Sequence, residues 1–277
     1  MKTINILLLL IMLIHPCINS LSASNNNENK AELIISYVAK FRNTQESRKI
    51  FEDEKILEIG KDYSAFYCLW NTRRDEVKDS VIAQGGTFYD VLNAVEKLGY
   101  PLSLQNYTVY KNYPDKGTLT YTEKNMKRFR YTEKMEQPVW TMEKGDSVIL
   151  GYPCQQASTT FRGRTWHVWF TPNIPISDGP WKLYGLPGLI LQADETADHF
   201  SFQCISIKKG TGQPVKTPRG KFIECTREKL AEMHTLDAKD PKGFMRMLGY
   251  RPGKAWWPDG REIVYEEKHP VFMEFPQ

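Results

Sequence analysis

The sequence has no large excess of charge of either sign. Its 37 Lys and Arg residues nearly balance its 33 Asp and Glu residues, which leaves a formal net charge of +4 over 277 residues. The chain contains no long basic run, whereas nucleic-acid binding normally requires clustered positive charge. The sequence therefore predicts no nucleic-acid partner.

Long apolar segments are also absent beyond the N-terminal region. A membrane-spanning helix needs about 20 consecutive apolar residues, and no later segment approaches that length. We find no internal repeat and no heptad pattern either. We therefore expect no transmembrane segment once the N-terminal region is removed, and no repeat architecture or coiled coil.

Histidine is scarce and dispersed. A dedicated metal site needs clustered ligands, such as two histidines four residues apart on a helix. No such pair occurs among the histidines of the predicted mature chain, so we expect no metal site and no cofactor. These histidines are His167, His199, His234 and His269.

The N-terminal residues have the order of a secretory signal peptide. Lys2 precedes the apolar run Ile6–Ile14, and the small residues within Ser20–Ala23 follow. A run of about nine apolar residues is too short to cross a bilayer. We predict cleavage near Ser20–Ala23, which removes residues 1–23. A lipoprotein signal with its lipid on Cys17 is the alternative.

Export places the mature protein in the periplasm of a Gram-negative bacterium or in the extracellular space. Residues 24–30 (SNNNENK) are polar and are interpreted as a linker. Residues 31–277 are numerous enough to bury a sizeable core. We interpret them as a single β-rich domain with a helical C-terminal segment.

Cysteine is infrequent. The predicted mature chain keeps four, an even number that is compatible with two disulfides in an exported protein. Four cysteines allow three pairings, and free buried thiols are an equal alternative, because a domain of this size does not need covalent cross-links. The possible disulfide cysteines are Cys68, Cys154, Cys204 and Cys225.

Alternating apolar and polar residues, the pattern of half-buried strands, dominate the rest of the sequence. Closely spaced strands favour antiparallel pairing, because parallel strands require crossover helices. The predicted fold class is mainly β (α+β), with a large curved antiparallel sheet or incomplete barrel and a few packed helices. The predicted strands are Leu33–Phe41, Leu57–Trp70, Leu104–Tyr110, Thr118–Thr122, Arg128–Thr132, Val139–Met142, Val148–Thr160, Thr165–Thr171, Leu189–Asp194 and Phe200–Ile207. The predicted turns are Pro114–Gly117, Gly145–Asp146, Gly163 and Gly210–Gly212.

Three helices are predicted from the residues at their ends. A capping box starts the first helix at Thr87, and Gly99 ends it. Thr226 caps a second helix. Asp240 followed by Pro241 is a cap and an N1 proline, which predicts a third short helix.

The stretch Asp178–Asp194, DGPWKLYGLPGLILQAD, combines glycine and proline breaks with an apolar composition. Pro187 fixes φ at roughly −65°, and Gly188 would supply the positive φ that a type II turn requires next. Alternation resumes at Leu189, which predicts a strand, whereas a phosphate-binding glycine loop normally opens a helix. We therefore interpret Gly185, Pro187 and Gly188 as a structural turn whose flanks enter the core.

These residues also carry a resemblance. Gly185–Ile190 is the hexapeptide GLPGLI, and the whole of Ile149–Asp194 resembles the core of the GLPGLI family of exported bacterial proteins. The similarity extends toward the N-terminus through KILEIGKDYSAFYC and is less clear in the last third of the chain. The resemblance implies membership of an exported family that has no assigned biochemical role.

A looser similarity concerns the fold. The order of the strands around ILGYPC, TWHVWFTP, LPGLILQAD and HFSFQCISI is similar to that of exported outer-membrane lipoprotein carriers (LolA-like proteins). Proteins of that type have an incomplete antiparallel barrel with helices against its concave side. This similarity implies a groove for an apolar ligand or an extended segment.

Cys154 and His167 are the residues that could form a nucleophile and its base. No local signature surrounds Cys154, and no group that would orient His167 is evident. We therefore interpret Cys154 as a core or disulfide cysteine and predict no catalytic residue.

Arg162 and Arg164 surround the predicted turn at Gly163 and precede Trp166 and Trp169. Guanidinium groups and indole rings together can hold a carboxylate, a phosphate or a sugar acid. With Trp181 they form the candidate ligand-binding set. The alternative is an ordinary hairpin in which the arginines are solvated and Trp166 faces the core.

The leading functional hypothesis is a non-enzymatic exported protein that binds or carries an apolar or extended ligand on a curved sheet. The alternatives are a secreted hydrolase that uses Cys154 and His167, and an envelope scaffold that contacts other proteins. An apolar ligand or an envelope protein is accordingly the expected partner.

Overall fold

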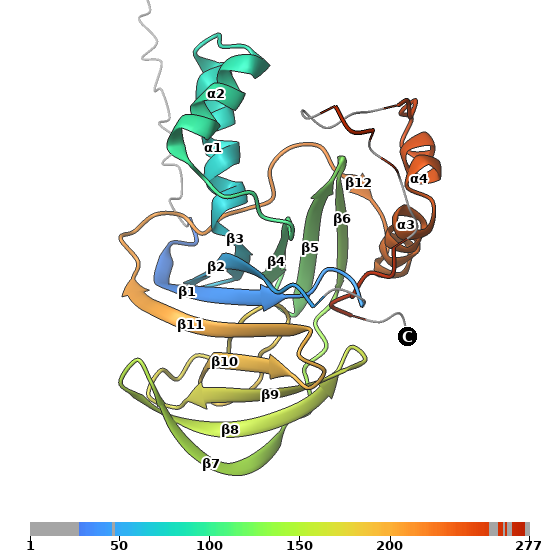
Figure 1. The fold of residues 1–277 in the computed structure, drawn as a ribbon. Helices are drawn as coiled ribbons and strands as arrows, with labels where there is room; N and C mark the ends of the chain where they lie inside the picture. The colour runs from blue at the N-terminus through green and yellow to red at the C-terminus, as the bar shows by residue number, and fades with distance from the viewer. Residues whose placement is uncertain (1–27, 46–47, 255–259, 263, 265–267, 275–277) are drawn as a thin grey trace, which may run out of the picture.

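The computed structural model describes residues 28–45, 48–254, 260–262, 264 and 268–274. These residues form one 12-stranded sheet and four helices (Figure 1). The strands are β1 (Ala31–Phe41), β2 (Phe51–Gly60), β3 (Ser64–Cys68), β4 (Tyr107–Lys111), β5 (Thr118–Asn125), β6 (Lys127–Lys134), β7 (Thr141–Ile149), β8 (Tyr152–Phe161), β9 (Arg164–Thr171), β10 (Leu189–Glu195), β11 (Phe200–Lys209) and β12 (Ile223–Glu224). The helices are α1 (Leu69–Ala83), α2 (Phe88–Leu98), α3 (Arg227–Lys239) and α4 (Pro241–Met247).

The sheet consists of two antiparallel meanders. Its strand order is β12-β6-β5-β4-β3-β2-β1-β11-β10-β9-β8-β7, so the meander β1 to β6 meets the meander β7 to β11 where β1 pairs with β11. The short strand β12 is parallel to β6, and the other neighbouring strands pair antiparallel. Most successive strands are joined by short connections, as the sequence predicts, whereas α1 and α2 lie between β3 and β4 and residues 172–188 lie between β9 and β10.

The sheet is strongly curved but open. Arg162, in the turn between β8 and β9, lies 3.3 Å from Glu133 of β6. Eight strands separate β6 from β8 in the sheet order, so the sheet must bend round for these side chains to meet. Among the described residues its end strands, β12 and β7, do not pair with each other. The predicted fold class is therefore confirmed.

The main core covers the inner face of the curved sheet. Inward side chains from strands at both ends of the sheet pack there against the loop of residues 172–188, which we call the corner loop, and against α3 and α4. The fully buried members include Tyr37, Leu57, Phe66, Trp166, Phe170, Leu183, Leu189 and Phe202. A smaller cluster lies on the outer face of β1 to β4, where Val215 covers Ile56 and Tyr67.

The caps of α2, α3 and α4 are as predicted. Thr87 and Asp90 form a reciprocal capping box at α2, and Gly99 ends that helix in the left-handed conformation at φ 65°. Thr226 accepts a hydrogen bond at the start of α3, and Asp240 does so at the start of α4. Local side-chain chemistry sets these three starts.

The sequence did not predict α1, and the single predicted strand Leu57–Trp70 is wrong, because this range contains the end of β2 at Gly60, the separate strand β3 and the start of α1. β3 stops at Cys68, and α1 begins at Leu69. Asn71 is the one residue of α1 that is buried. A helix that buries so little has no apolar stripe, so the usual periodic signal is missing.

The predicted turn at Gly145–Asp146 is also wrong. Gly145 lies within β7, at an irregularity in its pairing with β8. The chain turns instead at Leu150 and Gly151, which have φ of 51° and 83°. Two successive positive φ values are typical of the tight turns that join antiparallel strands.

The predicted signal peptide, residues 1–23, and residues 24–27 of the predicted linker lie outside the described residues. No described helix is long and apolar enough to span a membrane.

Candidate functional site

A groove of about 880 Å³ lies on the inner face of the sheet. One wall is formed by β4, β5 and β6. The other wall is formed by α3 and by residues 268–274, which we call the C-terminal strap. The aromatic residues that line the groove include Tyr107, Tyr121, Tyr131, Trp181, His234 and Phe272.

Three tyrosines line the sheet side of the groove. Tyr107 of β4 stacks on Tyr121 of β5 at a ring-centroid distance of 5.7 Å, and Tyr121 stacks on Tyr131 of β6 at 5.0 Å. Tyr121 and Tyr131 are direct partners across the strand pair. Stacked rings on neighbouring strands present a continuous apolar surface with a hydroxyl on each ring, which suits an amphipathic ligand.

Two buried polar groups beside this surface have no hydrogen-bond partner among the described residues. They are the hydroxyl of Tyr107 and the side-chain oxygen of Gln105. Burial raises the pKa of the Tyr107 hydroxyl, which therefore remains a neutral donor. An unpaired buried polar group costs about 1–3 kcal/mol, so a ligand that supplies its partner recovers that free energy.

His234 of α3 closes the groove opposite the tyrosines. Its Nε2 lies 2.6 Å from a carboxylate oxygen of Glu123 on β5, and its ring stacks on Phe272 of the strap. Burial alone lowers the pKa of His234. The hydrogen bond and charge of Glu123, with the charges of Asp237 and Glu274, outweigh burial and raise that pKa overall.

This arrangement predicts that stability depends on pH through His234. Because the folded pKa is raised, the contribution is fully present below about pH 6.5, the pKa of an unfolded histidine, and is lost as pH rises through the folded pKa. Urea unfolding of the wild type and of His234→Gln across this titration measures the effect. Identical pH profiles for the two proteins would contradict the assignment.

A cluster of buried and half-buried charges joins the two ends of the curved sheet. Lys182 of the corner loop lies 3.1 Å from Glu133 of β6 and 2.8 Å from Glu274 of the strap. Arg227 of α3 lies 3.4 Å from Glu133, and Arg162 lies 3.3 Å from it. We call these five residues the seam cluster. The cluster holds the corner loop, α3 and the strap together beside the groove.

A second buried ion pair anchors the corner loop. Lys111 of β4 forms an ion pair with Asp178 and donates a hydrogen bond of 2.6 Å to the carbonyl of Gly179. Ser64 of β3 donates a hydrogen bond of 2.6 Å to the other carboxylate oxygen of Asp178. Desolvation lowers the pKa of Lys111, and Asp178 opposes that shift. These contacts fix the start of the loop that carries Trp181 and Lys182.

The two arginines of the candidate ligand-binding set have partners within the protein. Arg162 occupies the turn with Gly163 and also lies 3.1 Å from Glu136. Arg164 is buried, lies 3.2 Å from Glu195, and donates a hydrogen bond to the carbonyl of Phe272. The alternative prediction of a hairpin with solvated arginines is therefore wrong, because both guanidinium groups are buried and paired with carboxylates.

The tryptophans of the same set differ in burial and in their neighbours. Trp166 and Trp181 are buried in the core, with ring centroids 5.6 Å apart. Trp169 is half-buried and lies close to Gly145 of β7. Trp181 is the member of the set that lines the groove.

The structure does not bring Cys154 and His167 together. Cys154 is buried in the core on the inner face, whereas His167 is half-exposed between the buried residues Trp166 and Val168 and therefore points outward. Burial raises the pKa of the Cys154 thiol, which disfavours a thiolate. This pair cannot act as a nucleophile and base.

The four described cysteines are free in the structure. Cys68, Cys154 and Cys204 are buried, and Cys225 is half-buried. Burial raises the pKa of Cys204 to about 12 and that of Cys225 to about 11. These thiols are packed as small apolar side chains.

The proline-glycine corner is a structural turn of a different type from the one predicted. Gly185 has a φ of 100°, but Gly188 is not among the residues with positive φ, so the type II turn is wrong. Gly188 is needed for another reason, because a Cβ there would lie 2.2 Å from the carbonyl oxygen of Thr171. Pro187 is exposed, and the predicted strand follows as β10.

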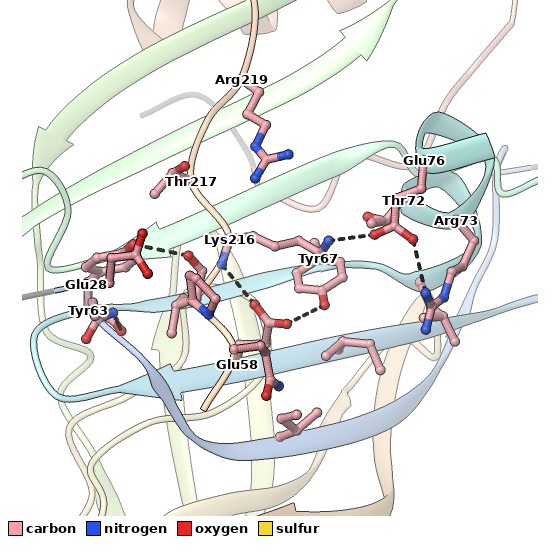
Figure 2. A pocket seen from close by; sticks show the side chains of 17 residues that line it. Glu28, Glu58, Tyr63, Tyr67, Thr72, Arg73, Glu76, Lys216, Thr217 and Arg219 are labelled. Carbon is pink, nitrogen blue, oxygen red and sulfur yellow. Dashed lines mark hydrogen bonds and ion pairs between the residues drawn. The ribbon is translucent and has the colours of Figure 1, made fainter. Parts of the chain in front are cut away.

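A second pocket, of about 600 Å³, lies on the outer face of the sheet beside α1 (Figure 2). Its centre is the buried carboxylate of Glu58, which accepts hydrogen bonds from the hydroxyl of Tyr67 at 2.9 Å and from the backbone N–H of Lys216 at 2.9 Å. The Lys216 ammonium lies 3.0 Å from Glu76, which also binds Arg73 at 3.0 Å. These groups satisfy one another and tie the segment after β11 to the sheet.

Sequence reasoning missed the tyrosines, His234 and Lys182. One signal was available, because the predicted strands 104–110, 118–122 and 128–132 carry inward aromatic residues at Tyr107, Tyr121 and Tyr131. No sequence signal marked Lys182 for burial, since charged residues are rarely buried without partners and its partners are distant in the chain.

Comparisons with known proteins identify a family model over part of the chain. Residues 103–192 match the model described as "Protein of unknown function (Porph_ging)". A comparison with curated proteins found no match.

Solved structures show weak likeness. The chain is 14% identical to two structures of PNGF-II, in the P21 and C2 space groups, with TM-scores of 0.49 and 0.46. Each match covers 73% of this chain and 32% of the other, so the chain spans about a third of the length of PNGF-II. A DUF1329 family protein from Desulfovibrio piger ATCC 29098 is 7% identical, with a TM-score of 0.21 and coverage of 66% of this chain and 88% of that one. Likenesses this weak assign no function.

Proposed function

We propose that the protein is a non-enzymatic, exported member of the GLPGLI family that binds or carries an apolar or extended ligand in the groove. One observation carries the proposal: a groove of about 880 Å³ is lined by three stacked tyrosines, and the buried hydroxyl of Tyr107 has no partner in the part of the chain that the structure describes. Most ligand sites combine such an apolar lining with a few polar groups.

The proposal on family and location rests on the sequence. The matched family range, residues 103–192, includes the GLPGLI hexapeptide Gly185–Ile190. In this proposal residues 1–23 are removed as a signal peptide, residues 24–30 are a linker, and residues 31–277 act as one domain in the periplasm or outside the cell. Trp181 is the member of the candidate ligand-binding set that would contact the ligand.

A groove-filling substitution tests this function. Ala231 lies in α3 and lines the groove, so Ala231→Trp places an indole in the space a ligand would occupy. We expect the wild type to bind the fluorescent apolar probe phenylnaphthylamine and Ala231→Trp to bind it at least about tenfold more weakly, a loss of about 1.4 kcal/mol. Fluorescence titration measures both affinities.

The control is Ala83→Trp, an exposed position at the end of α1 away from the groove lining. It should bind the probe as the wild type does. Equal binding by Ala231→Trp and the wild type, with both folded by circular dichroism, would refute the groove as the binding site.

A further inference from the structure

The C-terminal strap pairs through its backbone with residues 43–45, the segment that follows β1. The backbone N–H of Gln45 donates to the carbonyl of His269 at 2.9 Å, and the N–H of Val271 donates to the carbonyl of Asn43 at 3.1 Å. Thr44 and Pro270 form the antiparallel bridge between these bonds. Proteins that capture extended peptides use the same backbone pairing at a free strand edge.

Two buried cations hold the strap beyond this pairing. Arg164 donates to the carbonyl oxygen of Phe272, with its Nε at 2.9 Å. Lys182 lies 2.8 Å from the carboxylate of Glu274, which also accepts a hydrogen bond from the Tyr131 hydroxyl at 3.2 Å. Arg164 thus binds a main-chain carbonyl of the strap, and Lys182 and Tyr131 bind the acidic side chain two residues later.

These recognising groups do not depend on the strap. Without it, Arg164 keeps Glu195 at 3.2 Å, and Lys182 keeps Glu133 at 3.1 Å. No buried cation would therefore be left without a carboxylate, which is the condition that makes breaking a buried ion pair most costly.

The strap itself is held less firmly than the strands. Each of its residues is half-exposed or exposed, whereas Arg164 and Lys182 are almost fully buried. Val271 and Met273 pack against the edge of the core without being enclosed by it. A preformed buried receptor is thus occupied by a partly exposed segment.

From this geometry we infer that the site filled by the C-terminal strap, along one wall of the groove, is a receptor for an extended peptide of another protein, and that the strap is a tethered competitor for it. The recognised peptide pairs with residues 43–45, places an apolar side chain beside His234 and inserts a carboxylate at Lys182. This inference rests on the proposed function and specifies its ligand.

Labelled peptides provide the test. The probe is the strap sequence KHPVFME, residues 268–274, with an amidated C-terminus so that the glutamate side chain is its one carboxylate. The matched control peptide, KHPVFMQ, lacks that charge. Binding is measured by fluorescence anisotropy to the full-length wild type and to Glu274→Gln, in which the tethered competitor is weakened but can still form hydrogen bonds.

We expect Glu274→Gln to bind KHPVFME about tenfold more tightly than the wild type does, because a tethered segment competes at an effective concentration in the millimolar range. We also expect KHPVFMQ to bind Glu274→Gln about tenfold more weakly than KHPVFME, since charge-assisted hydrogen bonds are roughly twice as strong as neutral ones. Phe272→Ala removes the ring that stacks on His234, so it also weakens the tethered strap and should bind KHPVFME more tightly than the wild type does. This variant provides the test if Glu274→Gln does not fold.

The outcomes separate this inference from the proposed function. If phenylnaphthylamine binds in the groove but neither peptide binds the folded variants, or both bind equally, the receptor inference is wrong and the proposed function stands. If neither probe nor peptide binds, both are wrong.

Discussion

Replacing Lys111 with methionine is expected to lower the free energy of unfolding by about 3–5 kcal/mol, the usual cost of removing one partner from a buried ion pair. Methionine is close to lysine in length, so packing changes little. Asp178, however, keeps a buried charge that loses Lys111, its ion-pair partner among the described residues. Chemical denaturation monitored by tryptophan fluorescence measures the loss.

The matched control is Lys40→Met. Lys40 forms an exposed ion pair with Glu52 at 3.3 Å, and exposed pairs contribute roughly 0–1 kcal/mol. The double variant Lys111→Met with Asp178→Asn removes both charges and should recover part of the loss, because the asparagine can still accept from Ser64. A Lys111→Met protein as stable as Lys40→Met would show that the pair does not anchor the corner loop.

Gly188→Ala is expected to destabilise the protein by about 3 kcal/mol, at the upper end of the usual cost of overpacking. The three atoms nearest to the added Cβ are backbone atoms of Thr171 and Pro172, the nearest at 2.2 Å. Backbone cannot rotate away as a side chain can, so β10 must shift against β9, where Leu189 pairs with Thr171.

Gly253→Ala is the control for this substitution. A Cβ at Gly253 meets nothing within 4 Å, and its φ is not positive. The free energy of unfolding should stay within about 1 kcal/mol of the wild type, because such a change acts mainly on the entropy of the unfolded chain. If both alanine variants have the same stability, the close approach at Gly188 is not the reason for the glycine.

The sequence was sufficient for features that depend on neighbouring residues. Alternation located most strands, and the capping residues Thr87, Thr226 and Asp240 located three helices. Helix α1 was missed because it buries almost nothing. The predicted type II turn was wrong because the glycine at position 188 is required by the close approach of the Thr171 backbone, 17 residues earlier in the chain, and not by a positive φ.

The groove could not be predicted in the same way, because it depends on the curvature of the sheet. Tyr107, Tyr121 and Tyr131 form one surface because their strands pair in a particular register. Their position opposite His234 depends on where α3 returns to the sheet. The burial of Lys182 likewise requires Glu133 and Glu274 to meet at one point.

The curved sheet has a mechanical consequence for its interior. Ladder hydrogen bonds run continuously from β12 to β7, but β6 and the β8–β9 turn are joined by the side chains of the seam cluster. Side chains can change rotamer, whereas the hydrogen bonds between strands cannot stretch. The contact between β6 and the β8–β9 turn is therefore the adjustable part of the curved sheet. Under the proposed function, ligands of different width would therefore be accommodated by new rotamers of Lys182, Arg162 and Arg227, with every strand pairing intact.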